Sequence, residues 1–437
     1  MIKDRVKLVL PLLFFLLILS AAGCEDSGKV AVQEDHDGWT LRVDGKPFMV
    51  NGMNWDYFPI GTNYEYILWD ESAEFIRNAL DYEMGLLQDI GVNAIRVYTG
   101  IPKEWIEYIH DNFGIYTMLN HAFGRYGLSL DGEWVADTDY SDPRVIDTLL
   151  QEVTDLVREY RGTRGLLLYL LGNENNYGLF WSGAETEDIP GEDHELRIRA
   201  RHMYRLFNQA AVAMKEIDPD RPVAMANGDL LFLDIIVDEA PDVDIFGANV
   251  YRGISFTYLF DQVKEEYGKP VLLTEFGADA YNTRAQQEDQ HCQAYYIHGN
   301  WREIYAYAAG VGKAGNSIGG FTFQFSDGWW KIGQTFDLHV HNTEATWANA
   351  GYECDYVEGQ NNMNEEWFGV MAKGPTDSLG HYELYPRAAY FVLEQVHAFD
   401  PYAAGTTPEM IEEFFEGISI TDALKRAKSD KNDGNRH

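Results

Sequence analysis

The chain has 437 residues and a formal net charge of −36, with 70 Asp and Glu against 34 Lys and Arg. A field of that sign repels nucleic acid and other polyanions and excludes them as partners. Aromatic residues make up 14% of the chain, including 11 Trp and 27 Tyr, and their faces suit stacking on sugar rings. The composition therefore favours a neutral ligand of the glycan class.

Residues 1–23 have the composition of a lipoprotein signal peptide. Three positive charges precede an apolar run, 8–19, and small residues at 21–23 stand directly before Cys24. The run is short for a bilayer, which needs about 20 apolar residues, so a transmembrane anchor is disfavoured. We expect lipid attachment at Cys24, a polar tether over residues 24–44 and a location in the bacterial cell envelope, in the periplasm or on the outer-membrane surface. Plain secretion is the alternative.

Eight apolar runs of strand length follow, and helical patterns separate most of them. The runs are 48–53, 94–98, 115–119, 166–171, 222–226, 243–248, 270–273 and 320–325, and a hairpin over 39–48 precedes the first. Strands that alternate with helices are typical of a parallel sheet. Eight such units predict an α/β fold of the (β/α)8 TIM barrel class over residues 45–400.

Four long helices are predicted between these strands. Residues 72–90 place an apolar stripe on one face, and Gly91 ends the helix. Asp142 and Pro143 open the next helix as N-cap and first helical residue. Residues 194–217 and 287–309 show two more helical patterns. We expect these helices to surround the barrel, and the C-terminal extension 401–437 to be disordered from about Lys425.

The loops after the first, fourth and eighth strands are long and rich in aromatic and amide residues. They hold Trp55 after the first strand, Tyr177 and Trp181 after the fourth, and the stretch 327–385 after the eighth. Long loops without secondary structure are uncommon unless they build a binding site. We expect them to form the walls of an open cleft at the carboxyl end of the barrel.

Two glutamates each follow an apolar run of strand length. Glu174 stands in Leu-Gly-Asn-Glu-Asn after the fourth run, and Glu275 stands in Leu-Thr-Glu-Phe-Gly after the seventh. Barrel enzymes keep their chemistry at this end of the strands. Two carboxyl groups that face each other there suit glycoside hydrolysis, because one protonates the leaving oxygen while the other attacks or activates water at the sugar carbon.

At these residues the chain resembles the retaining glycosidases of clan A. The matching residues are Asn173-Glu174, Thr274 to Gly277, Arg96 in Ile-Arg-Val-Tyr, Asn249 and Tyr251 in Ala-Asn-Val-Tyr, and Trp329-Trp330. Within the clan the chain is most similar to the catalytic barrel of glycoside hydrolase family 2, and residues 91–98 and 114–116 resemble the fungal β-1,3-glucanosyltransferases of family 72. The resemblance covers residues 45–400. It implies that Glu275 is the nucleophile and Glu174 the acid/base.

The resemblance also implies roles for residues around the glutamate pair. Asn173 is expected to bind the sugar 2-hydroxyl, Arg96 to neutralise the surroundings of the nucleophile, and Tyr251 to orient it. Trp329 or Trp330 is expected to form the floor of the sugar subsite. Loop position adds further candidate substrate contacts: Trp55, His121, Trp181, Asn227, Asn249 and Asp279.

No cofactor is expected, because no metal-ligand cluster, phosphate-binding glycine loop or Ser-His-Asp order stands out in the sequence. His339 and His341 alternate, but such a pair is more often exposed to solvent than bound to a metal. Cys292 and Cys354 lack a CxxC neighbour. They can form a disulfide in an oxidising compartment, and the sequence leaves their pairing open.

The sequence thus predicts a retaining β-glycoside hydrolase or transglycosylase that acts on neutral β-glycans, with β-glucan favoured. One alternative is an exo-acting β-galactosidase or β-mannosidase of the family 2 type. Another is a non-catalytic glycan-binding surface lipoprotein, which would have no need of both glutamates. A basic pocket built from Arg96, Arg252 and Lys331 would overturn the expected neutral substrate, since a few well-placed cations outweigh a distant net charge.

Overall fold

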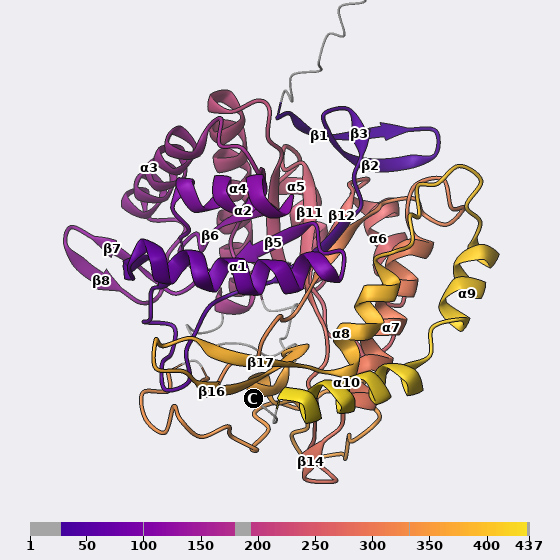
Figure 1. The fold of residues 1–437 in the computed structure, drawn as a ribbon. Helices are drawn as coiled ribbons and strands as arrows, with labels where there is room; N and C mark the ends of the chain where they lie inside the picture. The colour runs from indigo at the N-terminus through magenta and orange to yellow at the C-terminus, as the bar shows by residue number, and fades with distance from the viewer. Residues whose placement is uncertain (1–27, 99, 180–193, 332, 435–437) are drawn as a thin grey trace, which may run out of the picture.

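The computed structural model describes residues 28–98, 100–179, 194–331 and 333–434. Eight parallel strands close into a barrel in the order β10-β11-β12-β15-β4-β5-β6-β9, and helices surround it (Figure 1). The predicted barrel is therefore confirmed, and each of the eight predicted strands matches a barrel strand within a few residues. The strands are β4 (Val50–Asn54), β5 (Ala94–Val97), β6 (Tyr116–His121), β9 (Leu166–Leu171), β10 (Val223–Gly228), β11 (Ile245–Asn249), β12 (Val271–Phe276) and β15 (Ser317–Thr322).

A helix follows each barrel strand, and its apolar face packs against the outside of the barrel. The helices are α1 (Ala73–Asp89), α2 (Lys103–Phe113), α3 (Pro143–Tyr160), α4 (His194–Ile217), α5 (Leu233–Glu239), α6 (Leu259–Glu266), α7 (Gln290–Ala306) and α8 (Ala388–Val396). The predicted caps are present: Ser72 accepts from the Phe75 N–H, and Asp142 accepts from the Arg144 N–H. Helix α7 begins three residues later than expected, because Asp289 caps it.

The amino-terminal segment differs from the expected tether. Strands β1 (Val30–Asp35), β2 (Gly38–Val43) and β3 (Lys46–Pro47) form an antiparallel sheet, which lies at the end of the barrel opposite β16 and β17 (Figure 1). Val30, Leu41 and Val43 are buried in one cluster with side chains of the barrel interior. The alternation of these apolar residues with polar ones marks half-buried strands, so residues 30–43 are not a polar tether. The hairpin predicted over 39–48 is present as β2 and β3.

The carboxyl-terminal segment is also more ordered than expected. Helix α9 (Pro408–Glu416) packs on α7, and α10 (Ile420–Gly434) packs on α8, although disorder was expected from about Lys425. Ala423 and Ala427, four residues apart, are buried on one face of α10. Two small residues at helical spacing let α10 lie close to its neighbour, and the charged side chains around them hid this pattern.

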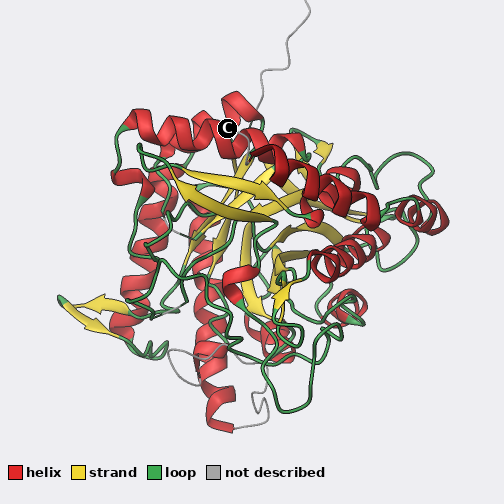
Figure 2. Cartoon of the chain, turned by 60° about the horizontal axis from the view of Figure 1, so that its bottom comes forward, coloured by secondary structure: helices red, strands yellow, loops and turns green. Residues whose placement is uncertain are grey.

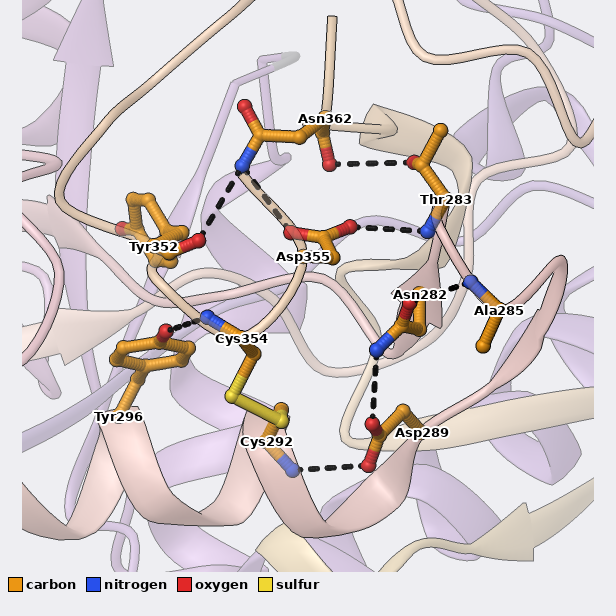
Figure 3. Close-up of a disulfide and its surroundings, with 10 residues drawn as sticks. All are labelled: Asn282, Thr283, Ala285, Asp289, Cys292, Tyr296, Tyr352, Cys354, Asp355 and Asn362. Carbon is orange, nitrogen blue, oxygen red and sulfur yellow. Dashed lines mark hydrogen bonds between the residues drawn. A yellow bond between two sulfur atoms is a disulfide. The ribbon is translucent and has the colours of Figure 1, made fainter. Parts of the chain in front are cut away.

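The long excursion after β15 returns as the hairpin of β16 (Met371–Thr376) and β17 (Tyr382–Pro386) before α8 begins. A disulfide joins Cys292 of α7 to Cys354 of the excursion, with the two Cα atoms 6.3 Å apart (Figure 3). Around it, Asp355 accepts from the Thr283 N–H and from the Asn362 side chain (Figure 3). The excursion is therefore fixed to the barrel scaffold by a covalent bond and a polar network.

Two shorter hairpins complete the fold: β7 (Leu128–Leu130) with β8 (Glu133–Val135), and β13 (Tyr281–Asn282) with β14 (Gln287–Glu288). The β7–β8 hairpin projects from the body of the molecule in both views (Figures 1 and 2). Within the described residues, every helix is too short or too polar to cross a bilayer.

Candidate active site

A cavity of about 760 Å³ lies at the carboxyl end of the barrel strands, the end that Figure 2 brings forward. Glu174 and Glu275 both line it, together with residues that follow β4, β5, β6, β9, β11 and β15. The cavity therefore brings together the two carboxylates that the sequence singled out. Its size is in the range of pockets for small molecules.

Three donors hold the carboxylate of Glu275, the fifth residue of β12. Arg96 donates to Oε1 at 2.8 Å, the Tyr98 hydroxyl donates to the same oxygen, and the Tyr251 hydroxyl donates to Oε2 at 3.1 Å. Burial is the largest cause that raises the pKa of both tyrosines well above the usual value for tyrosine. Their hydroxyls therefore remain protonated and act as donors. The expected contact of Tyr251 with Glu275 is present. The carboxylate is fixed in orientation at the cavity wall.

Arg96 connects Glu275 to a set of amide side chains beneath the cavity. Its guanidinium is fully buried, and it donates to Asn120 Oδ1 at 2.8 and 3.0 Å and to Asn173 Oδ1 at 2.8 Å. Asn249 in turn donates to Asn173 Oδ1 at 3.0 Å. The Arg96 guanidinium thus connects β5, β6, β12 and the end of β9. The Nδ2 atom of Asn173 donates to the Tyr126 hydroxyl, which holds Asn173 beside the cavity.

Glu174 lies in a turn that its two neighbouring asparagines hold in place. Its φ is 56°, in the left-handed region that residues other than glycine rarely adopt. Asn175 donates to the carbonyls of Ala122 and Phe123, and Asn176 exchanges two hydrogen bonds of 2.8 Å with the backbone of Gly228. The surrounding structure thus imposes an unusual backbone conformation at a cavity-lining carboxylate, a combination that is frequent at functional sites.

The cavity wall also contains Asp56 and Lys373. Burial raises the pKa of Asp56 to about 7, although Tyr98, Arg96 and Lys373 counteract it. Burial lowers the pKa of Lys373 to about 8, although the charges of Glu83, Asp327 and Asp56 counteract it. The Lys373 ammonium donates to the Phe58 carbonyl at 2.7 Å. Its charge is therefore partly balanced before any ligand binds.

Aromatic side chains form two separate walls. Phe58, Tyr64 and Trp330 form one cluster, with ring centroids of Trp330 at 5.4 Å from Phe58 and 5.6 Å from Tyr64. Phe58 and Tyr64 follow β4, and Trp330 follows β15. In the barrel order β15 stands between β12 and β4. Tyr126 and Trp134 lie on the other side, after β6. The expectation of aromatic walls agrees with this arrangement, and the open form of the cleft stays a prediction.

Several residues predicted to contact substrate lie elsewhere. Trp55 is buried and donates to Glu83 at 2.6 Å, and Trp329 stacks on His341 at 4.8 Å, so neither lines the cavity. His121 faces Glu152 at 3.5 Å on the outer side of the site. Buried Asn227 and Asp279 hold backbone groups in place. Trp181 lies outside the described residues.

The postulated basic pocket does not form at this site. Arg252 pairs with Asp229 at 2.6 Å, and Lys331 donates to the Glu344 carbonyl at 2.6 Å. Neither is among the residues that line the cavity. Arg96 contributes its charge from below, already paired with Glu275.

Sequence reasoning did not assign roles to several cavity residues that now stand out: Asp56, Tyr98, Asn120, Tyr126, Trp134 and Lys373. Tyr98 and Asn120 had a signal in the sequence, since each stands at the end of a barrel strand. Lys373 had none, because it lies far beyond both glutamates in the sequence and reaches the cavity from strand β16. Trp134 stands in a polar segment without a clear period.

The closed barrel and the two strand-end glutamates at one cavity define the class of glycoside hydrolases built on a (β/α)8 barrel. The profile of glycosyl hydrolases family 2, TIM barrel domain, matches residues 39–309. The chain therefore belongs to glycoside hydrolase family 2. The likeness to family 72 remains an expectation of the sequence alone.

Solved structures of similar fold include a family 2 galacturonidase and glucuronidases. A β-galacturonidase from Eisenbergiella tayi bound to galacturonate has 16% identity and a TM-score of 0.50, over 86% of this chain and 54% of its own. β-Glucuronidase 2 from Bacteroides uniformis has 15% identity and a TM-score of 0.52, over 85% and 37%. The β-glucuronidase from Bifidobacterium dentium has 17% identity and a TM-score of 0.50, over 84% and 49%.

The chain thus spans about half or less of the length of these structures, and likeness at this identity shows the shared fold. A search of curated proteins found no match.

Proposed function

We propose that the chain is an exo-acting retaining β-glycosidase in which Glu275 is the nucleophile and Glu174 the general acid and base. The observation that carries the proposal is the arrangement of the two carboxylates. Both line one cavity, and three donors orient Glu275 while Glu174 stands on a held, left-handed turn. Glycosyl transfer through a covalent intermediate uses two such carboxyl groups in one site, and we expect their oxygens to lie about 5 to 5.5 Å apart.

In the first step, an oxygen of Glu275 attacks the anomeric carbon and the glycosidic C–O bond breaks. Glu174 gives its proton to the leaving sugar oxygen. In the second step, water attacks the same carbon, Glu174 takes the proton from that water, and the bond to Glu275 breaks. Asn173 is positioned by Arg96 and Asn249 to accept or donate at the sugar 2-hydroxyl.

The volume of the cavity favours an exo mode over the endo cleavage of a long glucan. A volume of about 760 Å³ suits a terminal sugar with a short leaving group. We therefore prefer the exo-acting family 2 enzyme, which was the alternative in the sequence analysis, to a β-glucan hydrolase. Whether hydrolysis or transglycosylation follows depends on whether water or a sugar reaches the covalent intermediate.

The charges in the cavity favour a neutral terminal sugar. Five carboxyl groups line it, those of Asp56, Glu174, Glu275, Asp327 and Glu365, against one ammonium group, that of Lys373, among the described lining residues. A second candidate is a β-uronide, because Lys373 at the wall could pair with a sugar carboxylate. The structures of similar fold named above are enzymes that act on such sugars. Their similarity to this chain shows a shared fold and does not identify the substrate.

One experiment tests both readings. Nitrophenyl β-glucoside, β-galactoside, β-mannoside, β-glucuronide and β-galacturonide are compared by kcat/KM, with proton NMR following the configuration of the first product. We expect a neutral glycoside to be the best substrate and the product to retain its configuration. Inversion of configuration would overturn the mechanism, whereas a uronide preference that Lys373→Met abolishes would establish the second candidate.

Variants of the two glutamates assign their roles. Glu275→Gly should be inactive on natural substrate, and added azide should give a glycosyl azide of inverted configuration from an activated glycoside. Glu174→Ala should give the azide of retained configuration, because the nucleophile remains. Wild-type activity of Glu275→Gln would contradict the assignment.

We also propose that the protein is lipid-anchored in the cell envelope through Cys24. The signal sequence supports this, and so does the disulfide, since disulfides persist in oxidising compartments. Labelled fatty acid should be incorporated into the wild type and not into Cys24→Ala.

A further inference from the structure

The β7–β8 hairpin carries an exposed tryptophan at the mouth of the cavity. Trp134 is 66% exposed, the most exposed tryptophan among the large hydrophobic side chains of the described residues, and it still lines the cavity. A single exposed hydrophobic side chain is normal on a protein surface, so the informative observation is that this one lines the cavity. Nothing in the proposed chemistry at Glu174 and Glu275 uses this side chain.

The indole of Trp134 is positioned by its own hairpin. Gly127 has a φ of +100°, and a Cβ placed on it would lie 2.8 Å from Cζ2 of Trp134, so the ring lies against the Gly127 backbone. The base of the hairpin is held by Thr138, which donates to the Gly124 carbonyl at 2.5 Å, and by Tyr140, which donates to the Phe123 carbonyl at 2.9 Å. One face of the ring is thus supported while the side chain as a whole remains accessible.

The place of the hairpin in the barrel decides which part of a substrate it meets. The hairpin follows β6, which pairs with β9, the strand that leads to Glu174. In the closed order, β6 stands four strands from β12 and therefore opposite Glu275. The neighbouring Tyr126 is 41% exposed, and its hydroxyl accepts from Asn173 Nδ2 at 3.0 Å. Trp134 and Tyr126 thus lie on the acid side of the site, away from the nucleophile.

We propose that Trp134 and Tyr126 form the leaving-group subsite, which binds by stacking the sugar ring that departs from the terminal residue. This rests on the proposed function, because a general acid protonates the leaving oxygen and so has the departing ring beside it. The Phe58, Tyr64 and Trp330 cluster, which follows β4 and β15, is then left to contact the terminal sugar. The enzyme accordingly prefers oligosaccharides, or glycosides with a flat leaving group, over substrates that lack a leaving ring.

The test compares two substrates that share the best terminal sugar from the nitrophenyl panel. One is its β-linked disaccharide, and the other is its glycosyl fluoride, whose leaving group has no ring. Trp134→Ala should lower kcat/KM for the disaccharide about tenfold, as expected for one lost aromatic contact. It should leave the fluoride within about twofold of wild type, since the terminal sugar and both carboxylates are untouched.

Two further variants make the outcome decisive. Trp134→Phe keeps an aromatic face and should recover most of the disaccharide activity. Tyr258→Ala removes another exposed aromatic side chain, 60% exposed and outside the cavity lining, and should change neither substrate. Equal losses on both substrates, or no loss on either, would overturn the subsite while the proposed function stands. A wild type that cleaves neither substrate would overturn the proposed function, and the subsite with it.

Discussion

Arg96 shows how much of this site depends on the geometry of one side chain. Its guanidinium donates to Glu275, Asn120 and Asn173 while fully buried. A lysine offers one point charge and three rotatable donors, so it could not reach these acceptors in their fixed plane. The buried cation is compensated by Glu275 at 2.8 Å, which makes the proposed nucleophile and the structural core of the barrel interdependent.

His397, at the carboxyl end of α8, gives a pH-dependent prediction. Its Nδ1 atom lies 2.8 Å from the Ile90 carbonyl and its ring packs 4.8 Å from Trp301, and burial lowers its pKa from 6.5 to about 4. The unfolded chain binds a proton below about pH 6.5, whereas the native state does so only near pH 4. The native state therefore loses about 3 kcal/mol through this group as the pH falls from 7 to 4.

His397→Asn keeps a side-chain donor and removes the titration, so urea denaturation at several pH values isolates the effect. The free energy of unfolding of the wild type should fall relative to the variant across this window. A difference between wild type and variant that stays constant from pH 7 to pH 4 would show that His397 titrates alike in both states.

Among the elements, the long excursion after β15 depends most on contacts with other parts of the chain for its conformation. It carries Trp347 and Phe368 to the cavity, and Tyr352 donates to the Gly277 carbonyl at 2.6 Å, two residues beyond Glu275. Few of its residues lie in helices or strands. Its shape is therefore set by contacts with α7 and with the end of β12, among them the disulfide.

Breaking the disulfide should loosen the cavity wall more than the barrel. The bond closes a separation of 62 residues, which in the chain-entropy model contributes about 4 kcal/mol. Dithiothreitol should raise KM severalfold and lower Tm, while far-ultraviolet circular dichroism at 25 °C stays close to that of the oxidised protein. The double variant Cys292→Ser, Cys354→Ser should match the reduced protein and ignore the reductant. Unchanged KM and Tm after complete reduction would show that the polar network of Figure 3 suffices.

At the scale of the whole molecule, the net charge of −36 acts against the compact state. Asp and Glu outnumber Lys and Arg by 70 to 34, so ion pairs can offset only part of the mutual repulsion of the acids. Solvent-exposed charges are screened over about 10 Å at 0.1 M salt and about 3 Å at 1 M.

The Tm at pH 7 should therefore rise with added sodium chloride between about 0.05 M and about 0.5 M, because screening weakens this repulsion. Differential scanning calorimetry measures the shift. The same series near the isoelectric point, about pH 4.5, is the control and should show a much smaller change. A Tm at pH 7 that falls with salt would mean that favourable ion pairs outweigh the repulsion.

The sequence alone determined the barrel and the two glutamates that stand at its strand ends. Buried parallel strands are continuous apolar runs, and helices show a period of 3.6, so both patterns are local and readable. The motifs around Arg96, Asn173 and Tyr251 were also contiguous in sequence, and their place beside the cavity agrees with the expectation. The strand β1 was hidden in a short, acidic segment whose alternation was too brief to stand out, whereas β2 and β3 form the hairpin expected over 39–48.

Only the tertiary structure decided which residues meet at the cavity. Lys373 and Trp134 come from hairpins far from the glutamates in sequence, and Trp55 and Trp329 turn away into packing with Glu83 and His341. The pairing of Cys292 with Cys354 likewise depended on where the excursion crosses α7. Local patterns specify helices and strands because they report neighbours along the chain. Where loops and hairpins lie depends on contacts between distant segments, and no periodicity in the sequence records these.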